Sequence, residues 1–163
     1  MCALVQGGVR VDPGSLLDVL LLPAVRLATS TPRSDPSGDY AWRLFERAEK
    51  LKPGAFATLS GKANQLVGGP QSAATPAGRS AYGYWMEQKA ADVFLTYCTN
   101  AVQAMREVAG LRVLEVPPLL AVEAVYGVTL MQDANAAGRA FRDFLLSPAG
   151  QAILAAQGFS GIE

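Results

Sequence analysis

The chain has 163 residues, half of them apolar, and its 14 basic and 14 acidic side chains leave a net charge of zero. This is enough apolar material for one well-buried domain, and the balanced charge argues against a nucleic-acid-binding protein, which needs a basic surface. Histidine is absent, so a serine or cysteine nucleophile in this chain has no histidine base, and no metal site can use imidazole.

The two cysteines, Cys2 and Cys98, stand far apart and form no CxxC pair. Cys98 as a nucleophile lacks a base, so a small buried core thiol is the favoured interpretation. No basic segment followed by an apolar one marks a signal peptide, and the apolar stretch at 16–22 is too short to span a membrane. The chain opens directly on an apolar strand at 1–5, from which we expect that an N-terminal portion is missing.

The first part of the chain is predicted to alternate short apolar strands with helices, because apolar runs and helical periodicity follow one another between turn residues. In chain order we expect a strand at 1–5, a helix at 16–22, a strand at 24–29, a helix at about 40–51, a strand at 55–59 and a helix at 60–67. The helix ending at 51 is amphipathic and should pack one face on a sheet.

The joint between the strand at 24–29 and the helix after it, residues 29–40, is rich in hydroxyl side chains. Pro36 suits the first turn of a helix, and Asp35 or Ser37 can cap that turn. A strand that enters a helix through small residues leaves backbone N–H groups available to a small anion. An ordinary capped turn explains the same residues, so both interpretations stay open.

The second part of the chain continues the alternation after a Gly/Pro/Ser-rich stretch. We expect a loop at 68–78, a helix at 82–89, a strand at 92–96, a helix at 99–105, strands at 111–116 and 122–131, and helices at about 137–145 and 148–157. This pattern predicts an α/β fold with a mostly parallel, doubly wound sheet. Ligands of such sheets bind beyond the carboxyl ends of the strands, where the joints at 29–40 and 59–62 meet Tyr97.

Three segments carry a resemblance to a known family. Residues 35–41 resemble the helix start written PxGxYA, residues 91–101 the strand and turn ADxGxxYxSDA, and residues 141–159 the ending FLxFLLSPEGQAIL…YGF of periplasmic molybdate-binding proteins. These are the substrate-binding components of molybdate ABC importers, with the type II periplasmic-binding-protein fold. The resemblance implies a second lobe over about 6–121 and a returning strand with C-terminal helices over about 122–163, with the first lobe absent.

The resemblance also implies a function and a site. Members of the family hold a tetrahedral oxyanion, molybdate or tungstate, by hydrogen bonds alone, in the periplasm, and deliver it to an ABC transporter permease. Carried over, the ligand-binding residues are Ser37 and Gly38 of PxGxYA, the hydroxyl of Tyr97, and the start of the next helix near Lys62. No cofactor, resident metal, catalytic residue or nucleic acid is implied. Each residue also has a plain interpretation: an N-cap for Ser37, a core aromatic for Tyr97 and a solvated surface lysine for Lys62.

Two alternatives differ from an importer component. One is a cytoplasmic ligand-sensing effector module of the same fold, and the other is a binder of a different small anion. An enzyme has the least support. The apolar faces at 2–5, at 122–131 and on the final helices predict self-association, because soluble proteins seldom expose large apolar areas. Without the hydrogen bonds of a first lobe, we expect this chain to bind its anion weakly.

Overall fold

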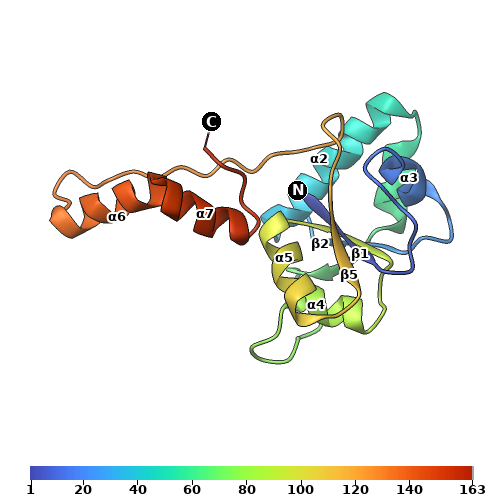
Figure 1. The fold of residues 1–163 in the computed structure, drawn as a ribbon. Helices are drawn as coiled ribbons and strands as arrows, with labels where there is room; N and C mark the ends of the chain where they lie inside the picture. Colours follow the sequence, from blue (N-terminus) through green and yellow to red (C-terminus); the bar gives the residue numbers. More distant parts are fainter. Residues whose placement is uncertain (163) are drawn as a thin grey trace. The chain divides into compact units, whose positions relative to one another are not determined.

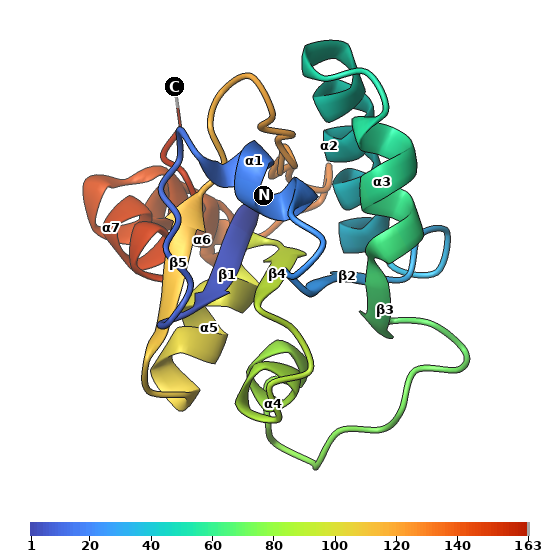
Figure 2. The same ribbon diagram turned by 90° about the vertical axis from the view of Figure 1, so that its right-hand side faces the viewer.

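A computed structural model describes residues 1–162 of the chain (Figures 1 and 2). Residues 1–123 and the residues from Ala124 onward form separate compact units. The strands are β1 (Cys2–Gln6), β2 (Leu27–Ser30), β3 (Asn64–Val67), β4 (Val93–Thr96) and β5 (Leu111–Glu115). The helices are α1 (Leu16–Leu21), α2 (Pro36–Leu51), α3 (Ala55–Lys62), α4 (Ala81–Glu87), α5 (Cys98–Glu107), α6 (Ala136–Leu146) and α7 (Pro148–Ala156).

The first unit is built on one sheet with the strand order β3-β2-β4-β1-β5. Strand β2 runs parallel to both of its neighbours, whereas β1 runs antiparallel to β4 and β5. Every strand in the described residues except β1 therefore points the same way. The predicted fold class, an α/β protein with a mostly parallel sheet, is confirmed.

Helices cover both faces of this sheet, because successive strand residues point to opposite sides. On β1, Ala3 and Val5 join a core cluster with residues of α1, α2 and α3. Cys2 and Leu4 join a second cluster with residues of α4 and α5. Figure 2 shows α2 and α3 side by side, and α4 lies apart from them with α5. The sheet is thus buried between two helical layers, as its apolar strands predict.

Helix α2 forms as its sequence predicts. Asp35 is the N-cap, and its Oδ1 accepts the backbone N–H of Ser37 at 2.8 Å, while Pro36 occupies the first helical position. The buried face consists of residues at helical spacing, among them Leu44 and Phe45, which are fully buried. Because β2 leads directly into this cap, the start of α2 is fixed at one edge of the sheet.

The elements expected over 55–67 were wrong. The structure has helix α3 where a strand was predicted at 55–59, and strand β3 where a helix was predicted at 60–67. Helix α3 lacks a cap in its own sequence, since its N-cap is Gly54 with a left-handed φ of 89°. Its first N–H groups are instead accepted by Glu49 of α2, at 2.9 Å from Gly54 N and 2.9 Å from Phe56 N. This cap comes from outside the segment, so local pattern did not reveal it.

The second unit contains α6 and α7, which agree with the predicted helices. Both begin at side-chain caps, with Asn135 Oδ1 accepting the N–H of Gly138 at 2.9 Å and Ser147 Oγ accepting that of Gly150 at 3.2 Å. The strand predicted at 122–131 is absent, and these residues have no regular secondary structure. An apolar, β-branched sequence forms a strand only when a neighbouring strand pairs with it, and no such partner lies among the described residues of this unit.

Candidate functional site

The carboxyl ends of β2 and β4 lie at the same edge of the sheet, because the two strands are parallel and Leu27 pairs with Val93. Helix α2 starts just beyond this edge after β2, and α5 starts immediately after β4, with Tyr97 as its N-cap. Two helix N-termini, each with a partial positive charge, therefore converge on one place. We call this place, made by residues 30–40 and 96–100, the edge site.

A buried hydrogen-bond bridge ties the two helix starts together. Ser37 Oγ of α2 lies 3.4 Å from Thr96 Oγ1 at the end of β4, and Asn100 Nδ2 of α5 donates to the same Thr96 oxygen at 3.1 Å. Ser37 and Thr96 are both fully buried. The structure thus brings Ser37 and Tyr97, which follows Thr96 directly, to the same side of the molecule.

Aromatic contact reinforces this bridge. The rings of Tyr40 in α2 and Tyr97 meet edge to face, with centroids 5.8 Å apart and an interplanar angle of 62°. The guanidinium carbon of Arg43 lies 5.3 Å from the centroid of the Tyr40 ring. Tyr97 is half-buried, and no side chain caps the start of α5 at this edge.

The start of α2 is less accessible than the sequence suggested. Ser37 has no exposed surface, and its N–H is already bonded to the Asp35 carboxylate. Asp39, in the first turn, accepts the backbone N–H of Arg33 at 2.7 Å. Two carboxylates therefore stand at this helix terminus. An anion that used the Ser37 N–H would first have to displace Asp35.

Gly38 is buried for a steric reason. A Cβ at this position would lie 2.6 Å from Thr31 C and Pro32 N and 2.7 Å from Ser30 O. All three are backbone atoms, which cannot move aside as a flexible side chain can. Gly38 therefore lets the first turn of α2 pack directly on the backbone that leaves β2, which fixes the edge site.

Lys62 does not belong to this site, and the expectation that a helix starts near it was wrong. Lys62 ends α3 and precedes β3, so it lies at the edge where the parallel strands begin. Its Nζ donates to the carbonyls of Leu20 at 2.9 Å and Leu22 at 2.6 Å. Partial burial lowers the pKa of Lys62. The lysine thus satisfies carbonyls at the C-terminus of α1.

The two cysteines form a disulfide, which corrects the expectation of a buried free thiol at Cys98. The pairing arises because the antiparallel register of β1 sets Cys2 beside Thr96, two residues before Cys98. The disulfide therefore lies at the edge site, where it joins the first residue of β1 to the first residue of α5.

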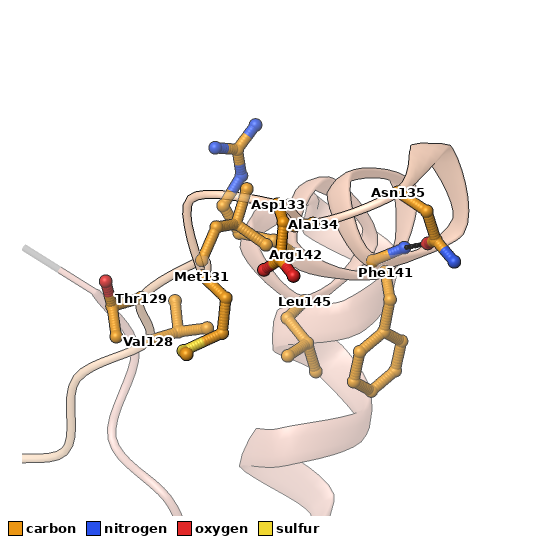
Figure 3. A pocket seen from close by; sticks show the side chains of 11 residues that line it. Val128, Thr129, Met131, Asp133, Ala134, Asn135, Phe141, Arg142 and Leu145 are labelled. Carbon is orange, nitrogen blue, oxygen red and sulfur yellow. Dashed lines mark hydrogen bonds between the residues drawn. The ribbon is translucent and has the colours of Figure 1, made fainter.

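The second unit has a separate hollow, shown in Figure 3. This pocket, of about 490 Å³, lies between the segment at 128–135 and α6. Met131, Phe141 and Leu145 extend along the same side of it, and Met131 and Phe141 are 75% and 62% exposed. Most of the pocket surface is apolar, and its lining also includes the polar side chains of Thr129, Asp133, Asn135 and Arg142.

Within residues 1–162, no cluster of metal-ligating side chains occurs, and no helix is long and apolar enough to cross a bilayer.

Sequence reasoning missed Thr96, Asn100 and the competing role of Asp35. Asn100 could have been predicted from the sequence, because it follows Tyr97 by about one turn of a helix. The hydrogen-bond bridge through Thr96 depends on the pairing of β2 with β4, and this pairing cannot be read from the sequence.

Three comparisons place the chain among known proteins. A family model described as bacterial extracellular solute-binding protein matches residues 1–160. The uncharacterized protein PM1146 of Pasteurella multocida is 40% identical over 110 residues, which are 68% of this chain and 45% of that protein. A solved structure from Clostridium difficile, described as the substrate-binding domain of a molybdenum ABC transporter, matches with a TM-score of 0.69 at 20% identity over 99% of this chain. The chain spans 63% of that structure.

Proposed function

The chain belongs to the bacterial extracellular solute-binding proteins, and from this premise we propose that it binds a tetrahedral oxyanion, molybdate or tungstate, for an ABC importer. The fold likeness to the molybdenum transporter component and the molybdate-family motifs around Gly38 and Tyr97 support this choice of ligand. The observation that carries the proposal is the convergence of two helix starts and the Tyr97 hydroxyl at one edge, joined through Thr96.

In this proposal Tyr97 donates its hydroxyl to the anion, and the uncapped start of α5 supplies backbone N–H groups. Ser37 and Gly38 hold the start of α2 against the sheet. The N–H of Ser37 becomes a ligand donor only when the Asp35 carboxylate swings away. Lys62, at the opposite edge, has no part in binding.

The disulfide favours a compartment outside the cytosol, because thiols in the cytosol are kept reduced. It supports a periplasmic or extracellular location and speaks against the alternative of a cytoplasmic sensing module. A binder of a different small anion stays a second candidate, since donor groups at helix starts accept sulfate or phosphate by the same chemistry.

The test is calorimetric titration of the full-length gene product with molybdate, tungstate, sulfate and phosphate. We expect molybdate or tungstate to bind, and Tyr97→Phe to weaken binding about 10- to 100-fold, as the loss of one hydrogen bond to a charged group predicts. Tyr84→Phe, which removes a hydroxyl from α4, is the matched control and should bind as the wild type does. Preference for sulfate or phosphate would establish the second candidate, and no binding of any of the four would refute the proposal.

A further inference from the structure

Three side chains near the edge site form a row: Arg43, Tyr40 and Tyr97. Arg43 and Tyr40 lie one turn apart on α2, with the guanidinium 5.3 Å from the Tyr40 ring centroid. The Tyr40 ring in turn meets the Tyr97 ring at 5.8 Å in an edge-to-face arrangement. These geometries are the favourable ones for a cation–π contact and an aromatic pair.

The ring contact to Tyr97 matters for ligand binding for a physical reason. Its backbone is fixed as the N-cap of α5, but its side chain is only half-buried and turns about two torsions. A hydroxyl donor binds a ligand tightly only when its direction is set beforehand, because ordering it on binding costs free energy. Tyr40 can set that direction, since its own ring packs against the core cluster under α2.

We propose that Tyr40 positions the Tyr97 hydroxyl for the anion and that Arg43 holds the Tyr40 ring in place; this inference rests on the proposed function. Tyr40 acts through its ring and not through its hydroxyl. Arg43 acts through its cation, which a lysine can replace at this distance. Both residues are therefore positioning residues, and Tyr97 alone among the three touches the ligand.

The positioning itself is measured without ligand. The protein is labelled with 3-fluorotyrosine at its five tyrosines, the Tyr97 resonance is assigned with Tyr97→Phe, and the mobility of the ring is followed by fluorine relaxation. Tyr40→Leu should raise the mobility of the Tyr97 ring, and Tyr40→Phe should leave it unchanged. Arg43→Met, which alters an exposed side chain, should raise it in the same direction. Unchanged mobility in both Tyr40→Leu and Arg43→Met overturns the inference.

Binding provides the second readout. In the full-length gene product, Tyr40→Leu should weaken molybdate binding about 2- to 10-fold, as the worth of an aromatic pair predicts. Tyr40→Phe and Arg43→Lys should each bind molybdate as the wild type does. In the Tyr97→Phe background, Tyr40→Leu should cost no further affinity, because its effect passes through the Tyr97 hydroxyl. An equal loss in both backgrounds overturns the inference, whereas a wild type that binds no oxyanion refutes the proposed function and leaves the relaxation result to decide positioning.

Discussion

Thr96 is the residue on which the edge site depends most directly. Its hydroxyl is the shared partner of Ser37 in α2 and Asn100 in α5. Since Thr96 and Ser37 are both fully buried, neither can turn to water if the other is lost. One side chain therefore links the starts of the two helices.

Thr96→Val tests this role, because valine keeps the shape of threonine and removes the hydroxyl. We expect a loss of about 1–3 kcal/mol in the free energy of unfolding, the cost of leaving buried polar groups unpaired. Urea denaturation measures it. Thr96→Ser keeps the hydroxyl and should retain most of that stability, and a loss as large as that of Thr96→Val would assign the effect to packing.

Asp35 is expected to compete with the ligand. Its carboxylate accepts the N–H of Ser37, so an anion gains that donor only by displacing it. Asp35→Ala should lower stability by about 1 kcal/mol through loss of the cap, and should strengthen oxyanion binding about 2- to 30-fold. Calorimetry of Asp35→Ala beside Asp12→Ala, which removes a distant carboxylate, measures the difference. Equal affinities would show that the N–H of Ser37 takes no part in binding.

The positions of the proposed site residues could be predicted only where the local sequence determines them. Ser37 and Tyr97 each sit at a strand-to-helix joint that is readable from turn residues, and parallel strands bring such joints to one edge. The predicted position of Lys62 at the start of a helix was wrong, because it depends on where α3 ends and β3 begins. The disulfide between Cys2 and Cys98 could not be foreseen, because it requires knowing that β1 lies antiparallel beside β4.

At the level of elements, the segment at 55–67 shows how helix and strand can be predicted in the reverse order of the one observed. Helix α3 begins after Gly54 and carries no cap of its own, and β3 is a half-exposed edge strand without apolar alternation. The decisive interactions come from α2 and β2: Glu49 caps the helix, and β2 supplies the hydrogen bonds of the strand. Tertiary partners thus override weak local preference.

Glu49 gives α3 a dependence on pH. Hydrogen bonds from the N–H groups of Gly54 and Phe56 lower the pKa of Glu49 in the folded protein. Its stabilising effect is therefore present above the unfolded pKa of about 4.3 and is lost as the pH falls through the lower folded pKa. Glu49→Gln should lower the urea midpoint at pH 7, and the difference from wild type should shrink below about pH 4. Glu46→Gln, on the same helix, should show no such trend.

At the level of the molecule, the chain covers 45% of PM1146 and 63% of the Clostridium difficile structure. If the rest of a full-length protein supplies two or more hydrogen bonds to the anion, residues 1–163 alone should bind about two to four decades more weakly. Parallel titrations of residues 1–163 and of the full-length gene product measure this. Submicromolar molybdate binding by residues 1–163 would contradict it.

The second unit should drive self-association of residues 1–163. Helices α6 and α7 leave Phe141, Phe144 and Ile153 between 45% and 62% exposed, and the surface of the pocket beside α6 is mainly apolar. Sedimentation velocity should show dimers or larger species at high concentration, because exposed apolar area favours association. Phe141→Ser should shift the distribution toward monomer, and Arg139→Ser on the same helix should not. A monomer at all concentrations would refute the prediction.

The fold was predictable in outline because its strands and helices alternate with clear periods, so the layers follow from the order of elements. The segment at 122–131 marks the limit of this reasoning. Its apolar, β-branched residues predict a strand, yet a strand needs a partner, and the structure pairs none with it. Residues from Ala124 onward instead form a unit of their own.

The disulfide links the two ends of the span 2–98 within the first unit, and the exposed loop at 68–79 lies inside that span. A protease that cuts this loop would leave two fragments that the disulfide still joins covalently. Electrophoresis without reductant would then show a single band of unchanged mass, and adding dithiothreitol would release the pieces.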